Sequence, residues 1–363
     1  MKSFSNTYNV CLTKEIREKA AKDIRKSKRI RQIMQKEAYT VDSVAADGYN
    51  WIEYYKNGDH TPLIINDGIS KKKRTILVPT IEELFVQHCV VDALKPMFYC
   101  GMYEHSYGSI PKRGAHKGKK TIEKWIKHGG SSIKYVLKMD IRQFFDSIPH
   151  EILKAKLARK LRDTDMLETL YYIIDATDRG LPLGFYTSQW LANWYLQDFD
   201  HFVKEKLGVK KYIRYMDDMV IFDSSKKRLH EIRRYISEYL ETELGLELKS
   251  NWQVFRFSYG NDRGRDLDFM GFRFYRNRTT LRRTIMLRAT RKASKISKKI
   301  KTTIYDARQM LAYLGWIKCT DTYNMYRKRI KLYINFGKLK RHISIFDKIY
   351  GMSMYRKLIS LYS

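Results

Sequence analysis

The segment that decides the fold is Lys211-Tyr-Ile-Arg-Tyr-Met-Asp217-Asp218-Met-Val-Ile-Phe222. Two apolar halves flank an adjacent pair of acids, a pattern that predicts a β-hairpin over residues 212–222. Tight hairpin turns favour Asn-Gly, whereas two aspartates at the turn repel each other. A cation relieves that repulsion, and Mg²⁺ prefers carboxylate oxygens. The alternative is that Asp217 and Asp218 merely solvate an ordinary turn.

A second acidic strand end strengthens the metal interpretation. The stretch Tyr135-Val-Leu-Lys-Met-Asp140 has the pattern of a buried strand, expected over residues 133–140. Beside the hairpin, Asp140 completes the arrangement for two-metal chemistry, in which ions about 3.5–4 Å apart activate a 3′-hydroxyl and stabilise pyrophosphate. We interpret Asp146 as structural, a cap for a helix expected over His150–Arg162.

Hydrophobic periodicity predicts further elements around these segments. They are a basic helix from Lys14 to Ala38, a strand over Arg74–Pro79, helices over Ile81–Phe98 and 229–244, and basic helices after residue 276. Another helix is expected to open at Ser188, a natural N-cap, and to bury Leu191, Trp194, Tyr195, Phe199 and Phe202 on one face.

Charge indicates a polyanionic partner. The chain carries 71 Lys and Arg against 39 Asp and Glu, a net charge of +32. Residues 276–363 hold 23 Lys and Arg but three acids, Asp306, Asp321 and Asp347. Nucleic acid neutralises such a surface through its phosphates, and the alternative is a highly soluble basic surface. The four cysteines show no zinc spacing, and no apolar run predicts a membrane span.

Six motifs in sequence order together resemble a reverse transcriptase. Arg74-Thr-Ile-Leu-Val-Pro79 is similar to the RxLxIP motif of the fingers, and Ser106-Tyr-Gly-Ser-Ile-Pro-Lys-Arg113-Gly114 to the SYGFRPGR loop of bacterial and group II intron enzymes. The strand ending at Asp140, the GxxxSQ turn at Gly184 and the Tyr-Met-Asp-Asp segment resemble the palm. Leu267–Phe274 is similar to the segment that grips the primer end.

One departure from the common pattern suggests a subgroup. Intron-type enzymes usually carry QGxxxSP, whereas this chain has Leu183-Gly184-Phe-Tyr-Thr-Ser188-Gln189. Leucine in place of glutamine, and SQ in place of SP, resemble the reverse transcriptases of diversity-generating retroelements. That resemblance implies error-prone copying of a template-repeat RNA, directed at adenines, into cDNA for mutagenic retrohoming. A leucine at position 183 can pack but cannot hydrogen-bond, so fewer polar checks on the nucleotide are expected. The alternative is that Leu183 simply completes a hydrophobic turn.

The resemblance implies a role for each matching residue. Asp140, Asp217 and Asp218 are the expected catalytic residues and ligands of two Mg²⁺ ions. Phe145 matches the steric gate that favours deoxynucleotides, or is alternatively a core aromatic, with Phe144 as its core partner. The expected nucleotide-binding residues are Arg74, Phe145, Leu183, Gly184 and Gln189, Gly184 allowing close approach of the backbone to substrate. One lysine of Lys71-Lys72-Lys73, taken as Lys72, is expected to assist; the spacing does not fix which, and a solvated basic turn is the alternative for these lysines. Those for primer and template are Met270, Gly271, Arg288, Arg291, Lys292 and Lys295.

The implied fold is α+β, a right-hand polymerase with fingers, a palm of antiparallel sheet plus helices, and a helical basic thumb. The expected boundaries are an N-terminal helical extension over 1–60, fingers over 61–133, a palm over 134–275 with a fingers insertion around 150–185, and a thumb over 276–363. Expected partners are dNTPs, template RNA, an RNA/DNA duplex and a small basic accessory protein, in a bacterial or phage-encoded cytoplasmic setting. Two alternatives remain, namely another bacterial group II intron-like or defence-associated reverse transcriptase, and an RNA-binding scaffold on an inactive palm.

Overall fold

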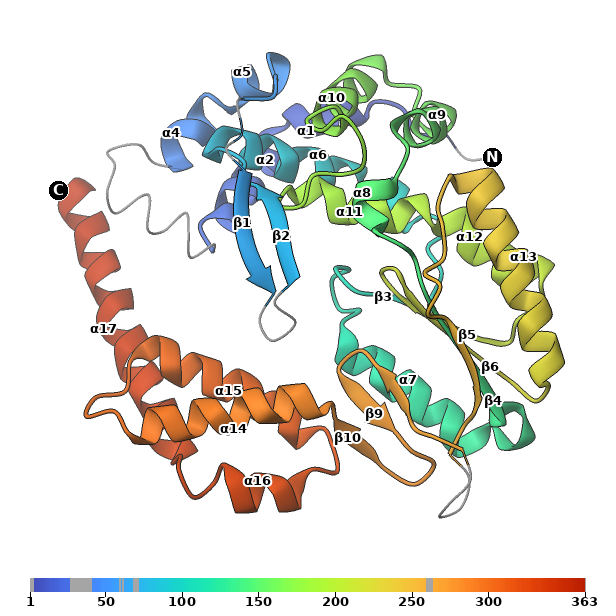
Figure 1. The fold of residues 1–363 in the computed structure, drawn as a ribbon. Coiled ribbons are helices and arrows are strands. Elements are labelled where there is room, and N and C mark those ends of the chain that lie inside the picture. The colour runs from blue at the N-terminus through green and yellow to red at the C-terminus, as the bar shows by residue number, and fades with distance from the viewer. Residues whose placement is uncertain are drawn as a thin grey trace. The chain divides into compact units, whose positions relative to one another are not determined.

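A computed structural model of the chain describes residues 3–26, 41–58, 60, 62–67, 72–258 and 264–362 (Figure 1). The chain divides into two compact units. The first comprises Met1–Gly114 and Ser131–Phe255, and the second comprises Ala115–Gly130 and Arg256–Ser363. Within the described residues, no helix has the length and apolar character needed to cross a membrane.

The first unit is built around a five-stranded sheet. Its strands, in spatial order, are β3 (Ser106–Tyr107), β5 (Lys211–Tyr215), β6 (Asp218–Asp223), β4 (Tyr135–Asp140) and β7 (Gln253–Arg256). β4 and β5 both pair antiparallel with β6, and β3 runs parallel to β5. Most of β4 and β6 is buried, as continuous apolar strands require. The predicted strand and hairpin are therefore confirmed.

A helical layer packs around α6 (Ile81–Tyr99), which is almost wholly buried. Thr80 begins this helix with a capping box to Glu83. The helices that contact α6 are α1 (Thr7–Leu12), α2 (Lys14–Ile24), α4 (Val41–Ala46), α5 (Gly48–Glu53) and α11 (Tyr186–Tyr195). The helix predicted over Ile81–Phe98 is confirmed, while the end of the stretch predicted from Lys14 to Ala38 lies outside the described residues.

Three helices follow β4. They are α8 (Phe144–Ser147), α9 (His150–Lys160) and α10 (Thr164–Ile174). The helix predicted at His150 is confirmed, but Asp146 does not cap it, because Asp146 lies inside α8 and Pro149 occupies the N-cap position. The short 3₁₀ helix η2 (Gly130–Ile133) precedes β4.

The helix expected to begin at Ser188 begins two residues earlier. Ser188 lies inside α11, where its hydroxyl donates to the carbonyl oxygen of Pro182 at 2.7 Å instead of capping. The helical path continues through α12 (Gln197–His201) and the π-helical turn η3 (Phe202–Lys206). The predicted apolar stripe is buried from Leu191 to Phe199, but its last member, Phe202, lies in η3 and is only partly buried. The helix α13 (Lys226–Leu244) confirms the one predicted over 229–244 and packs on β4 and β6.

A separate antiparallel hairpin joins β1 (Pro62–Asp67) to β2 (Lys72–Leu77). Its strand β2 begins and ends two residues before the predicted strand over Arg74–Pro79. Leu63, Ile64 and Ile65 of β1 are exposed.

The second unit combines a small sheet with helices. Its antiparallel sheet has the order β10 (Thr279–Leu281), β9 (Phe272–Phe274) and β8 (Leu267–Phe269). α7 (Ala115–His128) contacts this sheet through His116, whose ring lies 5.9 Å from that of Phe272. The remaining helices are α14 (Arg283–Ser297), α15 (Ile304–Lys318), α16 (Tyr323–Arg329) and α17 (Phe336–Tyr362), and α15 contacts the other three. Helices and sheets together confirm a mixed fold.

Candidate active site

Three aspartates meet at one end of the central sheet. Asp140 is the last residue of β4 and Asp218 the first residue of β6, and the two are directly opposite in the antiparallel register. Asp217 lies in the turn between β5 and β6, and its carbonyl oxygen accepts a hydrogen bond from the backbone of Ile141 at 3.3 Å. Pairing of β4 with the β5–β6 hairpin thus places the three aspartates selected from the sequence at the same end of the sheet.

Asp217 is perturbed by its burial and by its neighbour Asp140. Burial, followed by the charge and hydrogen bonding of Asp140, raises the pKa of Asp217 to about 6. Oδ1 of Asp140 is buried and has no hydrogen-bond partner within the described part of the chain. Such a site favours a cation, because clustered carboxylates are costly to ionise without one. The residues therefore fit the Mg²⁺ that the resemblance implies.

Ammonium groups partly supply that positive charge. Lys249 donates to Oδ2 of Asp140, and Nζ of Lys138 lies 3.9 Å from Oδ2 of Asp218. Over the described ranges, no three His, Cys, Asp or Glu side chains form a ready-made metal site. The sequence analysis did not select Lys249, because nothing in the local pattern of residues 245–252 indicates a contact with a strand more than a hundred positions earlier.

Phe144 and Phe145 begin α8, close in sequence to Asp140. Phe144 is 2% exposed and belongs to the core, whereas Phe145 is only partly buried. The two rings meet edge to face at 5.5 Å. The carbonyl oxygen of Phe145 accepts from the backbone of Leu181 at 2.7 Å, which ties α8 to the turn that carries Leu183.

The turn at Leu183 and Gly184 is attached to β2. The backbone nitrogen of Leu77 donates to the carbonyl oxygen of Leu183 at 2.8 Å. Gly184 has φ +115°, and a β-carbon there would collide with the carbonyl oxygen of Leu77 and lie 2.5 Å from Ile76. Close backbone approach was expected toward substrate, but this glycine approaches β2. Gln189 is exposed on α11.

Arg74 and Lys72 both belong to β2. Arg74 is exposed and lies opposite Ile65 of β1. The side chain of Lys72 lies outside the described part of the structure.

The candidate primer and template residues lie in the second unit. Met270 and Gly271 form the turn between β8 and β9, and both have positive φ. On α14, Arg288, Arg291 and Lys295 are exposed. Lys292 differs from them because it is partly buried and forms an ion pair of 2.7 Å with Asp306 of α15. Lys299 contacts the same carboxylate at 2.5 Å. Both ammonium groups are therefore paired with Asp306 within the second unit.

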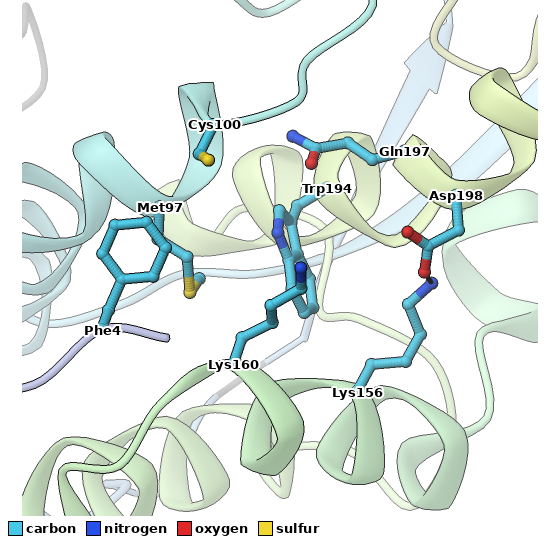
Figure 2. Close-up of a pocket in the computed structure, with 8 residues that line it drawn as sticks. All are labelled: Phe4, Met97, Cys100, Lys156, Lys160, Trp194, Gln197 and Asp198. Carbon is cyan, nitrogen blue, oxygen red and sulfur yellow. Dashed lines mark hydrogen bonds and ion pairs between the residues drawn. The ribbon is translucent and has the colours of Figure 1, made fainter. Parts of the chain in front are cut away.

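A small cavity elsewhere in the first unit does not qualify as a substrate site. Figure 2 shows Lys156 and Asp198 pointing toward each other in its lining, joined at 2.7 Å, with Phe4 and Trp194 among the other lining residues. Its volume is about 30 Å³, which is room for about one water molecule.

Comparison with known proteins identifies a matching family and several proteins similar to this chain. Residues 56–274 match the family described as Reverse transcriptase (RNA-dependent DNA polymerase). Protein YkfC of Escherichia coli (strain K12) is 24% identical over 251 residues, covering 57% of this chain and 65% of that protein. Group II intron-encoded protein LtrA of Lactococcus lactis subsp. cremoris is 29% identical over 167 residues, covering 42% of this chain and 27% of that protein. The Retron Ec73 reverse transcriptase of Escherichia coli is 24% identical over 204 residues, covering 52% of this chain and 62% of that protein.

The chain spans less than two thirds of the length of each of these relatives. Among solved structures, telomerase from Candida tropicalis with a fragment of telomeric RNA matches with a TM-score of 0.49 and 13% identity. That alignment covers 80% of this chain and 58% of the telomerase chain.

Proposed function

Because this chain belongs to the reverse transcriptase (RNA-dependent DNA polymerase) family, we propose that it extends a DNA primer along an RNA template. The observation that carries the proposal is the convergence of Asp140, Asp217 and Asp218 at the end of the central sheet. Family membership indicates RNA-directed DNA synthesis, and the three aspartates are the side chains that this chemistry requires.

The three aspartates are the proposed ligands of two Mg²⁺ ions. When bound, such ions activate the primer 3′-hydroxyl and stabilise the leaving pyrophosphate. The protein's own contribution is to fix the carboxylates on paired strands before metal arrives, so that little reorganisation is needed. The buried Oδ1 of Asp140 and the raised pKa of Asp217 both support a cation site here.

The β1–β2 hairpin, α8 and the turn at Leu183 and Gly184 carry the residues proposed to bind the nucleotide. Arg74 is exposed on β2, and its guanidinium suits two-point binding of a triphosphate. Phe145 is proposed as the steric gate, since its ring is only partly buried. Leu183 and Gly184 are proposed to line the nascent base pair, with Gln189 and Lys72 as further contacts.

In the second unit, the exposed basic residues of α14 are the proposed contacts to a template–primer duplex. Arg288, Arg291 and Lys295 offer charge to phosphates without reading sequence. Met270 and Gly271 are proposed to support the primer end. In this assignment residues 61–133 are fingers, 134–275 palm and 276–363 thumb.

A more specific proposal is that the enzyme belongs to a diversity-generating retroelement. Leu183 and the Ser188-Gln189 pair support it. Such an enzyme would copy a template-repeat RNA with errors at adenines and work with a small basic accessory protein. The competing assignment is an intron- or retron-type enzyme, which the names of LtrA and the Retron Ec73 protein favour.

Primer extension on an RNA template tests the general proposal. We expect Mg²⁺-dependent cDNA synthesis that is lost after RNase treatment of the template and falls roughly 100-fold or more in Asp217→Asn. The matched control is Asp175→Asn, which changes the C-cap residue of α10 in the same unit, an aspartate that pairs with Lys154 at 2.7 Å. Absence of synthesis, or synthesis that Asp217→Asn leaves unchanged, would favour an RNA-binding scaffold.

A further inference from the structure

Arg214, on β5, is a fully buried cation three residues before Asp217. Its side chain is 1% exposed, and that of its partner Asp200 on α12 is 0% exposed. Nη2 and Nε of Arg214 donate to the two carboxylate oxygens of Asp200 at 2.6 and 2.9 Å. Tyr212 adds a hydrogen bond of 2.8 Å from its hydroxyl to Asp200. Both charges are therefore paired in two-point fashion, which is what makes their burial tolerable.

The remaining nitrogen of the guanidinium contacts the turn itself. Nη1 of Arg214 donates to the carbonyl oxygen of Met216 at 3.0 Å and to Oδ1 of Asn193 at 3.2 Å. Met216 is the residue immediately before Asp217, and its φ of +55° is unfavourable for a residue with a β-carbon. An unfavourable backbone conformation persists only where surrounding contacts enforce it.

Asn193 holds the same turn from a second direction. Its amide nitrogen donates to the carbonyl oxygen of Gly108 at 3.2 Å and contacts the sulfur of Met216 at 3.1 Å. The backbone nitrogen of Met216 donates to the carbonyl oxygen of Tyr107 at 3.0 Å. The residue before Asp217 is thus fixed at its nitrogen, its carbonyl oxygen and its side chain.

We propose that Arg214 is a positioning residue which, together with Asp200 and Asn193, holds Met216 in its left-handed conformation and so directs Asp217 into the carboxylate cluster. The inference rests on the proposed function, because it concerns the metal site of the same reaction. Lysine cannot replace Arg214 in this role, since a single ammonium group lacks the planar fork that binds Asp200 at two points while also reaching Met216.

The test measures metal binding separately from polymerisation. Mn²⁺ binding to the nucleic-acid-free protein is followed by electron paramagnetic resonance, with Asp217→Asn defining the signal of the cluster. We expect Arg214→Lys to weaken Mn²⁺ binding about tenfold or more, the usual effect of losing a group that orients a metal ligand. In primer extension, kcat should fall while the KM for dNTP changes little.

Lys156→Met is the matched control, because Lys156 is also a buried cation of the first unit, paired with Asp198 and distant in sequence from the turn. It should retain Mn²⁺ affinity even if its unfolding temperature falls. If Arg214→Lys does not fold, Asn193→Ala replaces it, since this change removes the contact to the sulfur of Met216 and the hydrogen bond from Nη1 of Arg214, while Arg214 stays paired with Asp200. It should weaken Mn²⁺ binding in the same direction.

Unchanged Mn²⁺ affinity in a folded Arg214→Lys or Asn193→Ala protein would overturn the positioning role, as would an equal loss in Lys156→Met. A wild-type protein that binds Mn²⁺ through Asp217 but makes no cDNA would contradict the proposed function alone. Failure of the wild type to bind Mn²⁺ through Asp217 would overturn the metal site and, with it, this inference.

Discussion

The side chain of Lys249 donates to Oδ2 of Asp140, and its backbone nitrogen donates to the carbonyl oxygen of the same aspartate at 2.8 Å. The segment after α13 is therefore attached to the end of β4 at both its main chain and its side chain. Because an ammonium group and a metal ion satisfy the same carboxylate, Lys249 and a bound cation compete for the charge of Asp140.

Lys249→Met should therefore strengthen metal binding. Removing the ammonium leaves the carboxylates with less compensating charge, so we expect Mn²⁺ affinity to rise about fivefold, equivalent to about 1 kcal/mol for a partly exposed pair. The unfolding temperature should fall without metal and recover with Mg²⁺. Lys154→Met, which removes a partly buried lysine paired with Asp175, is the control and should change neither property. Weaker Mn²⁺ binding in Lys249→Met would mean that the lysine supports the site.

Leu183→Gln tests the error-prone subtype. The backbone of this residue is fixed by its hydrogen bond from Leu77, so the side chain can change without moving the turn. A glutamine amide can hydrogen-bond along the nascent base pair, and about 1 kcal/mol of added discrimination would lower misincorporation opposite template adenines about fivefold. Sequencing of cDNA made on a defined RNA measures this. Leu183→Met keeps an apolar side chain and should retain the wild-type error spectrum, whereas an unchanged spectrum in Leu183→Gln would count against the role.

Gly184→Ala should destabilise the first unit. The new β-carbon would collide with the carbonyl oxygen of Leu77, and a φ of +115° is unfavourable for alanine. We expect a loss of about 2 kcal/mol or more in the free energy of unfolding, measured by urea denaturation. Gly114→Ala is the control, because a β-carbon at Gly114 has no neighbour within 4 Å. Equal stability of the two variants would show that the turn relaxes away from β2.

Local patterns in the sequence were sufficient for the central strands and the acidic turn. The apolar runs that end at Asp140 and flank Asp217 predicted β4 and the β5–β6 hairpin, because buried strands leave a continuous hydrophobic signal. The order of motifs then indicated which strand ends meet. Pairing of Asp140 with Asp218 could be expected because it follows from strand register rather than from side-chain detail.

Long-range polar contacts could not be predicted in this way. Ser188 has the chemistry of an N-cap, yet its hydroxyl bonds to Pro182, since the helix begins before it. Gly184 needs its conformation because of Leu77, more than a hundred positions earlier. Lys292 has the same helical spacing as its exposed neighbours, and only the packing of α15 places Asp306 against it. Each depends on a partner that periodicity does not identify.

Asp306→Asn should give a pH-dependent loss of stability in the second unit. Burial alone would raise the pKa of Asp306, but hydrogen bonds from Lys292 and Lys299 lower that pKa below its ordinary value. A carboxyl group with a lowered folded-state pKa stabilises the protein above its unfolded pKa of about 3.9, and that stabilisation is lost as pH falls through the folded value. We expect wild type to exceed Asp306→Asn by about 2 kcal/mol near neutral pH.

The difference between the two proteins should shrink steadily in acid below about pH 4. Thermal unfolding of both proteins across a pH series measures it. Both halves of the capping box can form in both proteins: the Thr303 hydroxyl accepts from the backbone nitrogen of residue 306, and an asparagine amide oxygen can accept from the backbone nitrogen of Thr303 as the carboxylate does. Loss of the cap therefore does not account for the difference. A difference that is constant with pH would show that the effect is one of packing rather than charge.

Arg291→Gln and Lys295→Gln should weaken binding of an RNA/DNA duplex, whereas Lys292→Gln should mainly lower stability. All three lie on α14, but Arg291 and Lys295 are exposed while Lys292 is occupied by Asp306. Each lost phosphate contact reduces the slope of log affinity against log salt by about 0.9. Fluorescence anisotropy over a salt series measures that slope, and thermal unfolding measures stability. If Lys292→Gln lowers the slope as much as Arg291→Gln does, the ion pair with Asp306 must open when nucleic acid binds.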